Sequence, residues 1–418
     1  MKILILLSLF LLSSHPLLSQ GPQWITYNTG NSDLPSDNVH SLAVDQNNNI
    51  WVGTDSGLAQ FKNNKWILYN TSNSAIPSNN ISGVSIDDFN NVWISTIDSG
   101  AAVFDHASWI IYKTSNSGIQ YNNLGCVYID AFNSKWFGTG GVSKYDGLSW
   151  LNFNTLNSNI PNSAVLAITS RSNELWISTY HKGIARLIDT TWTVYNQTNS
   201  PLPNDYTNVI YKDFENNIWV GMETEGIAKI TENYSWQIIN KNNSGLPGNW
   251  VLEILITPQV KWFGTGAWGL AQQKDTTWTV FNVQNSPLQS NTILSLARDS
   301  SGNLWIGTFG GLAVYNEGGI VHVNNTILTI PKEFRLHQNF PNPYNSETKI
   351  LFTLKDNTEI SLTIYDISGR LVSKLLQGRL QPGNHSIIFK SENLPSGVYF
   401  YTLKSSEYSE TKKMVLVK

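Results

Sequence analysis

The side chains best suited to chemistry in this 418-residue chain are two glutamates, a histidine and a lysine in short loops. Glu223 and Glu225 stand two residues apart, and His181 and Lys182 occupy the equivalent loop one repeat earlier. Such groups could serve a glycosidase or a polysaccharide lyase, but acid–base cleavage needs carboxyls on opposite sides of the bond. The sequence also lacks a metal triad, a phosphate loop and a Gly-x-Ser-x-Gly elbow. We therefore expect no catalytic residue, metal or cofactor.

Aromatic side chains in the same loops favour binding over catalysis. Trp250 and Trp268 are the only tryptophans outside the regular series described below, and both belong to one repeat. Aromatic residues, Trp above all, are enriched among binding hot spots. The candidate ligand-binding residues are Trp250, Trp268, Tyr180, His181, Lys182, Glu223, Glu225 and Phe309. Neutral drift in exposed loops is the alternative for each residue taken singly.

The other tryptophans reveal the elements that must position these loops. One series steps by 40 to 43 residues: Trp51, Trp93, Trp136, Trp176, Trp219, Trp262 and Trp305. The second steps by 41 to 44 residues: Trp24, Trp66, Trp109, Trp150, Trp192, Trp236 and Trp278. A fixed period in this range indicates a repeat architecture, and each repeat contains four short β-branched and aromatic runs separated by turn residues. Seven repeats predict an all-β fold with a seven-bladed β-propeller over residues 22–324, in which both series are core.

An aspartate recurs six residues before the first-series Trp in five repeats: Asp45, Asp87, Asp130, Asp213 and Asp299. Calcium binding is one interpretation, but these segments lack the glycine and distal glutamate of a calcium loop. We instead expect an Asx turn that closes the first hairpin. Repeats four and six carry Arg171 and Thr257 at this position.

Two segments compete for the outer strand of the seventh blade. Trp24–Tyr27 precedes its own blade, whereas residues 319–324 occupy the same repeat position downstream with Ile320 in place of Trp. We favour Trp24–Tyr27 beside Leu312–Tyr315, because this pairing keeps the Trp. A closed ring removes the exposed sheet edges that could pair with other chains.

The repeats resemble those of two-component-regulator propellers, the extracytoplasmic sensor domains of some hybrid histidine kinases. The segments that carry the resemblance are Asn-Asn-Ile-Trp-Val-Gly-Thr-x-x-Gly-Leu-Ala at 48–59 and Gly-Asn-Leu-Trp-Ile-Gly-Thr-Phe-Gly-Gly-Leu-Ala at 302–313. The transmembrane helix and kinase of that family are absent. The resemblance implies a ligand-binding propeller without signalling output.

The period breaks after Asn325, and a linker at 325–335 leads to a second all-β unit at 336–418, a small immunoglobulin-like sandwich. Three segments of this unit resemble the C-terminal sorting domain of type IX secretion cargo in Gram-negative bacteria. They are Gln-Asn-Phe-Pro-Asn-Pro-Tyr-Asn at 338–345, Tyr-Asp-Ile-Ser-Gly-Arg-Leu-Val at 365–372 and Leu-Pro-Ser-Gly-Val-Tyr-Phe at 394–400. A generic carbohydrate- or matrix-binding sandwich is the alternative.

The second resemblance implies export by the Sec pathway, passage across the outer membrane and removal of the domain by the sortase of that system. The product is then released or attached to surface lipopolysaccharide. Gly369 and Gly397 are expected in turns that need positive φ. With them, Arg370, Lys412 and Lys413 are the candidate contacts with the secretion machinery.

The chain ends and composition agree with this route. Met1–Ser19 reads as a secretory signal peptide, and no later stretch reaches the ~20 apolar residues of a membrane-spanning helix. The net charge of −3 and the absence of basic blocks give no support to a nucleic-acid partner. Cys126, the one cysteine, excludes an intramolecular disulfide and is expected to be a small buried apolar residue.

Three functions remain open at this stage. The leading hypothesis is a secreted or cell-surface propeller that recognises glycan or protein ligands without catalysis. The second is an extracellular carbohydrate-active enzyme, and the third is a purely structural surface or adhesion component. The sequence does not identify the ligand or the oligomeric state.

Overall fold

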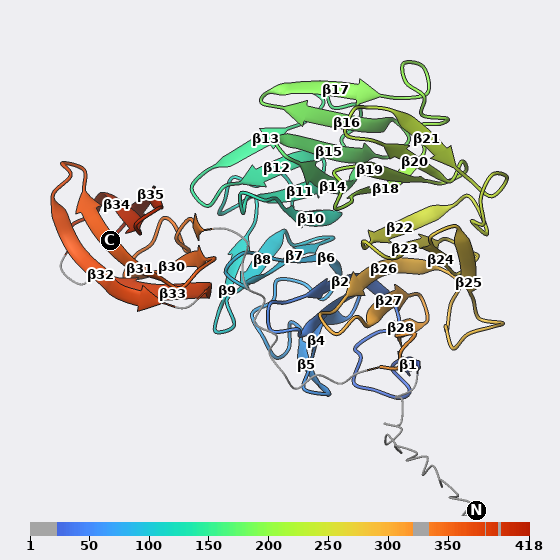
Figure 1. Ribbon diagram of the computed structural model, residues 1–418, viewed down its shortest axis with the longest axis horizontal. Helices are drawn as coiled ribbons and strands as arrows, with labels where there is room; N and C mark the ends of the chain where they lie inside the picture. The colour runs from blue at the N-terminus through green and yellow to red at the C-terminus, as the bar shows by residue number, and fades with distance from the viewer. Residues whose placement is uncertain (1–22, 321–333, 381, 392–393) are drawn as a thin grey trace, which may run out of the picture.

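The computed structural model describes residues 23–320, 334–380, 382–391 and 394–418. Over these ranges the chain is all β, with seven four-stranded sheets arranged in a ring and two further sheets in a separate sandwich (Figure 1). The predicted signal peptide, most of the predicted linker and residues 321–324 lie outside the described residues.

Each sheet of the ring is an antiparallel four-stranded blade whose first strand lies nearest the centre (Figure 1). Blade one consists of β2 (Val39–Val44), β3 (Ile50–Thr54), β4 (Gly57–Lys62) and β5 (Lys65–Tyr69), and blade two of β6 (Ile81–Ile86), β7 (Val92–Thr96), β8 (Ala101–Phe104) and β9 (Trp109–Tyr112). Blade three consists of β10 (Cys126–Ile129), β11 (Lys135–Thr139), β12 (Gly141–Tyr145) and β13 (Trp150–Phe153). Blade four consists of β14 (Val165–Arg171), β15 (Glu174–Thr179), β16 (Gly183–Ile188) and β17 (Thr191–Tyr195). Blade five consists of β18 (Thr207–Lys212), β19 (Ile218–Met222), β20 (Ile227–Ile230) and β21 (Trp236–Ile239). Blade six consists of β22 (Val251–Ile256), β23 (Lys261–Thr265), β24 (Leu270–Lys274) and β25 (Thr277–Phe281). Blade seven consists of β26 (Ile293–Arg298), β27 (Leu304–Thr308), β28 (Gly311–Tyr315) and the N-terminal strand β1 (Trp24–Tyr27).

The first Trp series lies on the second strand of every blade and is at most 5% exposed. The five recurring aspartates form the expected Asx turns: in blade one, Asp45 Oδ1 accepts the backbone N–H groups of Asn47 and Asn49. The other carboxylate oxygen accepts the indole N–H of the blade's own Trp, at 2.8 to 3.0 Å in all five blades. One side chain therefore closes the first hairpin and satisfies the buried indole.

Blade four reaches the same result with a different acceptor. Arg171 replaces the aspartate, and Trp176 Nε1 donates to Glu174 Oε2 at 2.9 Å. The Arg171 guanidinium pairs with that carboxylate at 2.7 Å and donates to the carbonyl oxygen of Asn216 in blade five. In blade six the hydroxyl of Thr257 closes the shortened turn by hydrogen bonds with Val260.

The second Trp series lies on the outer strands and is half-buried, except for Trp192, which is 6% exposed. The prediction that both series are core is therefore correct for the first series and too strong for the second. An outer strand is paired along only one edge, and its side chains lie at the rim of the blade.

The ring closes through the N-terminal strand, as favoured above. β1 pairs with β28 in the register Trp24↔Tyr315 to Tyr27↔Leu312. Ile320 does not replace Trp24; it packs in the cluster that joins blades one and seven.

The C-terminal unit contains a three-stranded sheet, β29-β30-β33, and a four-stranded sheet, β32-β31-β34-β35. Its strands are β29 (Arg335–Leu336), β30 (Glu347–Leu354), β31 (Thr358–Asp366), β32 (Leu371–Leu380), β33 (Gly383–Lys390), β34 (Gly397–Lys404) and β35 (Ser409–Leu416). Alternation of apolar residues at 350–354, 360–365, 386–389, 398–403 and 411–417 indicates β30, β31, β33, β34 and β35, but not the two-residue strand β29. The same pattern also misses β32, because none of its side chains is fully buried and its apolar alternation is weak.

Replacement of Asp45 by Ala should destabilise the protein, because it leaves the Trp51 indole and two turn N–H groups without their acceptor. We expect a loss of about 2 to 4 kcal/mol in the free energy of unfolding, measured by chemical denaturation of the full chain. Asp33→Ala, at an exposed aspartate, is the control. Equal effects of the two substitutions would contradict this role for the aspartate.

Candidate functional site

The blade-to-blade crossovers share one construction. In the crossover into blade one, Asn31 Nδ2 donates to the carbonyl oxygen of Thr26, and Ser32 Oγ donates to that of Asn28. The Asn bond recurs before every blade, at 2.9 to 3.1 Å. The repeated Asn-Ser pair is thus a structural element, and functional differences must lie in the residues around it.

In blades two to seven, the short loop between the second and third strands is joined to the crossover that leads into the next blade. In blade five, Gly226 N donates to the carbonyl oxygen of Asn249 at 3.0 Å, and in blade four Gly183 N donates to that of Asp205. Both glycines have φ near +80°, which favours glycine. These bonds place the predicted loop residues of one blade beside the crossover residues of the next, on a surface that we call the crossover face.

Blades four and five bring three of the predicted residues together. The rings of Tyr180 and His181 stack with centroids 3.7 Å apart, and the rings of His181 and Tyr206 are perpendicular with centroids 4.4 Å apart. His181 Nε2 lies 3.7 Å from Glu223 Oε2, and both side chains are substantially exposed. The result is an aromatic cluster with an acid at its side, open to solvent.

Blade six presents the two tryptophans outside the series. Trp250, at the end of the crossover, lies against Gly266, where an added Cβ would come within 2.2 Å of the ring. Trp268, in the short loop, lies in the same way against Gly248. The two side chains are 37% and 43% exposed. Packing on the loops explains part of each ring, and the remainder faces solvent.

The other predicted residues lie in the equivalent short loops of their own blades. Phe309 is half exposed in blade seven, and Lys182 and Glu225 flank their loops in blades four and five. The structure therefore groups Tyr180, His181 and Glu223, and it leaves Trp250, Trp268 and Phe309 as separate exposed aromatics on the same face.

Sequence reasoning missed two aromatic residues of this face, Tyr121 and Tyr206. Tyr206 ends its crossover at the position that Trp250 occupies in the next blade, and Tyr121 lies over Gly140 in blade three. Most other blades have small or polar residues at these two positions, such as Ser36 and Asn38 in blade one. Comparison of the crossovers position by position would have found both.

Glu253 is a further departure from the repeat. It stands on the innermost strand of blade six, where the other blades have Ser41, Gly83, Cys126, Ala167, Val209 and Ser295. Burial raises the pKa of Glu253 to about 8, although the backbone N–H of Ile254 donates to its carboxylate. The carboxyl is therefore largely protonated at neutral pH, and it stands three residues after Trp250.

The candidate contacts with the secretion machinery lie on the second sheet of the sandwich. Gly369 has φ +77° in the β31–β32 turn, and the Arg370 side chain beside it is 83% exposed. The expectation of positive φ is wrong for Gly397, which begins the extended strand β34. Lys412 pairs with Glu410 at 2.9 Å, and the Lys413 side chain is exposed.

Among the residues that the structure describes, no cluster of His, Cys, Asp or Glu side chains could hold a metal ion. The same residues include no helix long and apolar enough to span a membrane.

Glu253→Gln tests the buried carboxyl through pH. Because the folded-state pKa is raised, the unfolded state loses its proton first, and wild-type stability falls as pH rises from about 5 to 8. Glutamine has no such proton, so the stability of the variant relative to wild type should grow over this window by about 2 to 4 kcal/mol. Glu232→Gln, at an exposed glutamate, should follow the wild-type curve. Parallel curves for Glu253→Gln and wild type would contradict a raised pKa.

Cys126 is partly buried and packs against the core of blades three and four, so the expectation of a fully buried residue is too strong. Burial raises the pKa of its thiol to about 12, so very little thiolate exists at neutral pH. We expect the folded protein to react with a thiol reagent at pH 8 at least about 100-fold more slowly than free cysteine. The denatured chain should react at the free-cysteine rate. A fast reaction before denaturation would show an accessible, ionisable thiol.

Family models match parts of the propeller and the C-terminal sandwich. The model for two component regulator propellers matches residues 33–56 and 287–310, and the model for the secretion system C-terminal sorting domain matches residues 338–418. No curated protein matches the chain.

Solved structures share the fold at low sequence identity. The extracellular domain of BT3049, a proposed hybrid two-component system of B. thetaiotaomicron, is 18% identical with a TM-score of 0.63, over 94% of this chain and 57% of that one. PorZ, an essential surface component of the type-IX secretion system of Porphyromonas gingivalis, is 16% identical with a TM-score of 0.56, over 94% and 61%. Virginiamycin B lyase from Staphylococcus aureus is 15% identical with a TM-score of 0.56, over 70% and 98%.

These likenesses show the fold alone, since sensors, a secretion component and a lyase share it. The chain spans less than two thirds of the length of the BT3049 domain and of PorZ. The family-model matches and the observed sheets together identify the parts of the chain. It carries two-component-regulator repeats folded as a seven-bladed β-propeller, followed by a type IX secretion C-terminal sorting domain.

Proposed function

We propose that the chain is an exported binding protein whose propeller recognises a glycan or protein ligand on its crossover face, without catalysis. The observation that carries the proposal is the gathering of exposed aromatic side chains on that face. They come from five consecutive blades: Tyr121, Tyr180, Tyr206, Trp250, Trp268 and Phe309.

The chemistry of these residues suits uncharged or weakly cationic ligands. Flat aromatic rings stack on sugar faces and on peptide side chains, and large rigid rings give contact area at little cost in conformational entropy. Glu223 and Glu225 add carboxylates at the edge of the cluster, able to accept hydrogen bonds from hydroxyl or amide groups.

The geometry gives less support to an enzyme. Among the predicted site residues, His181 and Glu223 lie 3.7 Å apart, and both side chains are substantially exposed. Burial of the kind that shifts catalytic groups occurs instead at Glu253, inside the ring. The sorting domain supports export to the cell surface or beyond, where glycans and protein surfaces are the available ligands.

A glycan and peptide array probed with the full mature chain tests this function. We expect wild-type binding to be lost in a Trp250→Ala/Trp268→Ala double variant with an unchanged melting temperature, because truncation of hot-spot aromatics typically costs about 2 kcal/mol or more each. Phe214→Ala, at an exposed aromatic in a hairpin turn of blade five, is the matched control. Absence of wild-type binding, or binding indifferent to both tryptophans, would contradict the proposal.

A further inference from the structure

Strand β30 of the sorting domain is buried on both faces. Ile350, Phe352 and Leu354 point into the core of the sandwich. Leu351, between them, is 6% exposed and belongs to a cluster that otherwise contains Phe340 and residues of propeller blades two and three. The side chains of a strand alternate between its two faces, so the propeller covers the second face of β30.

An aromatic side chain from the sorting motif fills the centre of this contact. Phe340 is 7% exposed, and its ring meets that of Trp93 edge-on with centroids 6.1 Å apart. It also lies 6.4 Å from the ring of Phe89, in the first hairpin turn of blade two. Trp93 is the first-series tryptophan of blade two, and its indole packs between blades two and three. The sandwich therefore contacts one of the side chains that join neighbouring blades.

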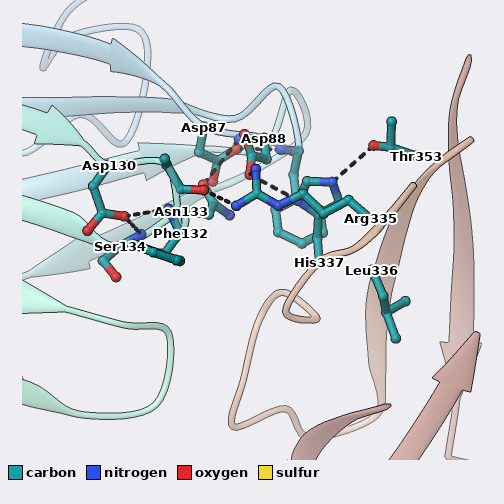
Figure 2. A network of polar contacts seen from close by, with 12 residues as sticks. Asp87, Asp88, Asp130, Phe132, Asn133, Ser134, Arg335, Leu336, His337 and Thr353 are labelled. Carbon is teal, nitrogen blue, oxygen red and sulfur yellow. Dashed lines mark hydrogen bonds and ion pairs between the residues drawn. The ribbon is translucent and has the colours of Figure 1, made fainter. Parts of the chain in front are cut away.

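A polar network borders the aromatic contact (Figure 2). His337 Nδ1 lies 2.9 Å from Asp88 Oδ2, and its other ring nitrogen lies 3.1 Å from Thr353 Oγ1 within the sandwich. Arg335 Nη1 lies 3.9 Å from the same Asp88 oxygen, and the guanidinium donates to the carbonyl oxygen of Ala131 in blade three. One aspartate of the propeller thus receives two basic side chains of the sorting domain.

The electrostatics of Asp88 fit this pairing. Burial alone would raise the pKa of the Asp88 carboxyl, but the His337 hydrogen bond and the charges of His337, Arg335 and Lys135 together lower it. The carboxylate therefore stays ionised where burial would otherwise favour the neutral acid. At the outer edge of the contact, Tyr145 Oη donates to the carbonyl oxygen of Asn342 at 3.4 Å.

The propeller side of the contact is particular to blade two. The residue after the recurring aspartate is Gln46, Ala131, Phe214 and Ser300 in the other blades that have this turn, and it is acidic only in blade two. Blade three supplies Tyr145 and the Ala131 carbonyl beside it. Residues with a purely structural role recur from repeat to repeat. Asp88, the acidic residue found at this turn position only in blade two, therefore indicates a surface that binds one specific partner, here the sorting domain.

We propose that residues 335–342 are a docking segment that holds the sorting domain on blades two and three, and that the secretion machinery contacts the other sheet of the sandwich. The first sheet is then occupied within the molecule. The sheet β32-β31-β34-β35 presents the exposed side chains of Arg370, Ile367 and Lys413. Part of the segment that resembles a sorting motif thus serves contact with the exported domain itself.

The docking is tested by a distance measurement in the full chain. Spin labels on cysteines replacing Leu156 in the propeller and Ile367 in the sandwich use positions that are 95% and 76% exposed. We expect one narrow distance distribution, which Asp88→Asn and Phe89→Ala widen at least about twofold, because domains without a firm interface move relative to one another. Glu215→Gln and Phe214→Ala change an acid and an aromatic in the hairpin turn of blade five, and they should leave the distribution narrow.

Export from a host with the type IX system tests the free sheet. Arg370→Glu/Lys413→Glu should lower the exported fraction at least about fivefold, because reversed charge repels a complementary partner, while the distance distribution stays narrow. Asp88→Asn should be exported at the wild-type level. A broad wild-type distribution, or one unchanged by both Asp88→Asn and Phe89→Ala, would overturn the docking. Normal export of the charge-reversed variant, with loss of export in Asp88→Asn, would overturn the assignment of the free sheet.

Discussion

The propeller depends on an acceptor for the buried indole N–H of the first Trp series, which a carboxylate supplies in blades one to five and in blade seven. A large Trp ring fills the wedge between neighbouring sheets, but its N–H carries a penalty if it is buried alone. In five blades the aspartate of the first hairpin accepts it, so the residue that shapes the turn also fixes the ring that joins the blades. Hairpin geometry and inter-blade packing are coupled through a single carboxylate.

Blade four shows that the requirement concerns the acceptor and not the residue type. Glu174, on the strand itself, replaces the turn aspartate, and Arg171 and Arg186 balance its charge. This exchange could not be read from the sequence, since Glu174 does not align with the aspartates. The period, the blade number, the crossovers and the closing strand were predictable, because each is repeated or follows from the spacing of the tryptophans.

The candidate site was less predictable, and for a physical reason. A repeat fixes where loops emerge, but the orientation of an exposed side chain depends on neighbours in the next blade. Trp250 and Trp268 are recognisable as tryptophans outside the series. Tyr206 requires a comparison of the crossovers position by position, and its contact with His181 is known only from the structure. The docking of the sorting domain was not predictable either, since Phe340 and Phe89 come from segments with no common period. The sequence repeat does make Asp88 and Glu253 recognisable, because the other blades have different residue types at the equivalent positions.

Closure by β1 has a consequence for the order of events during export. The first strand of the chain joins the last blade, and Gln23 contacts Glu317 across 294 positions of sequence. A chain that crosses a membrane from its N-terminus delivers β1 first and its partner β28 last of the propeller strands. Blades one to six can pair their strands as they emerge, while β1 waits unpaired and the ring remains open. The sorting domain comes after β28 in the sequence, so it emerges only when every strand of the propeller is available for pairing.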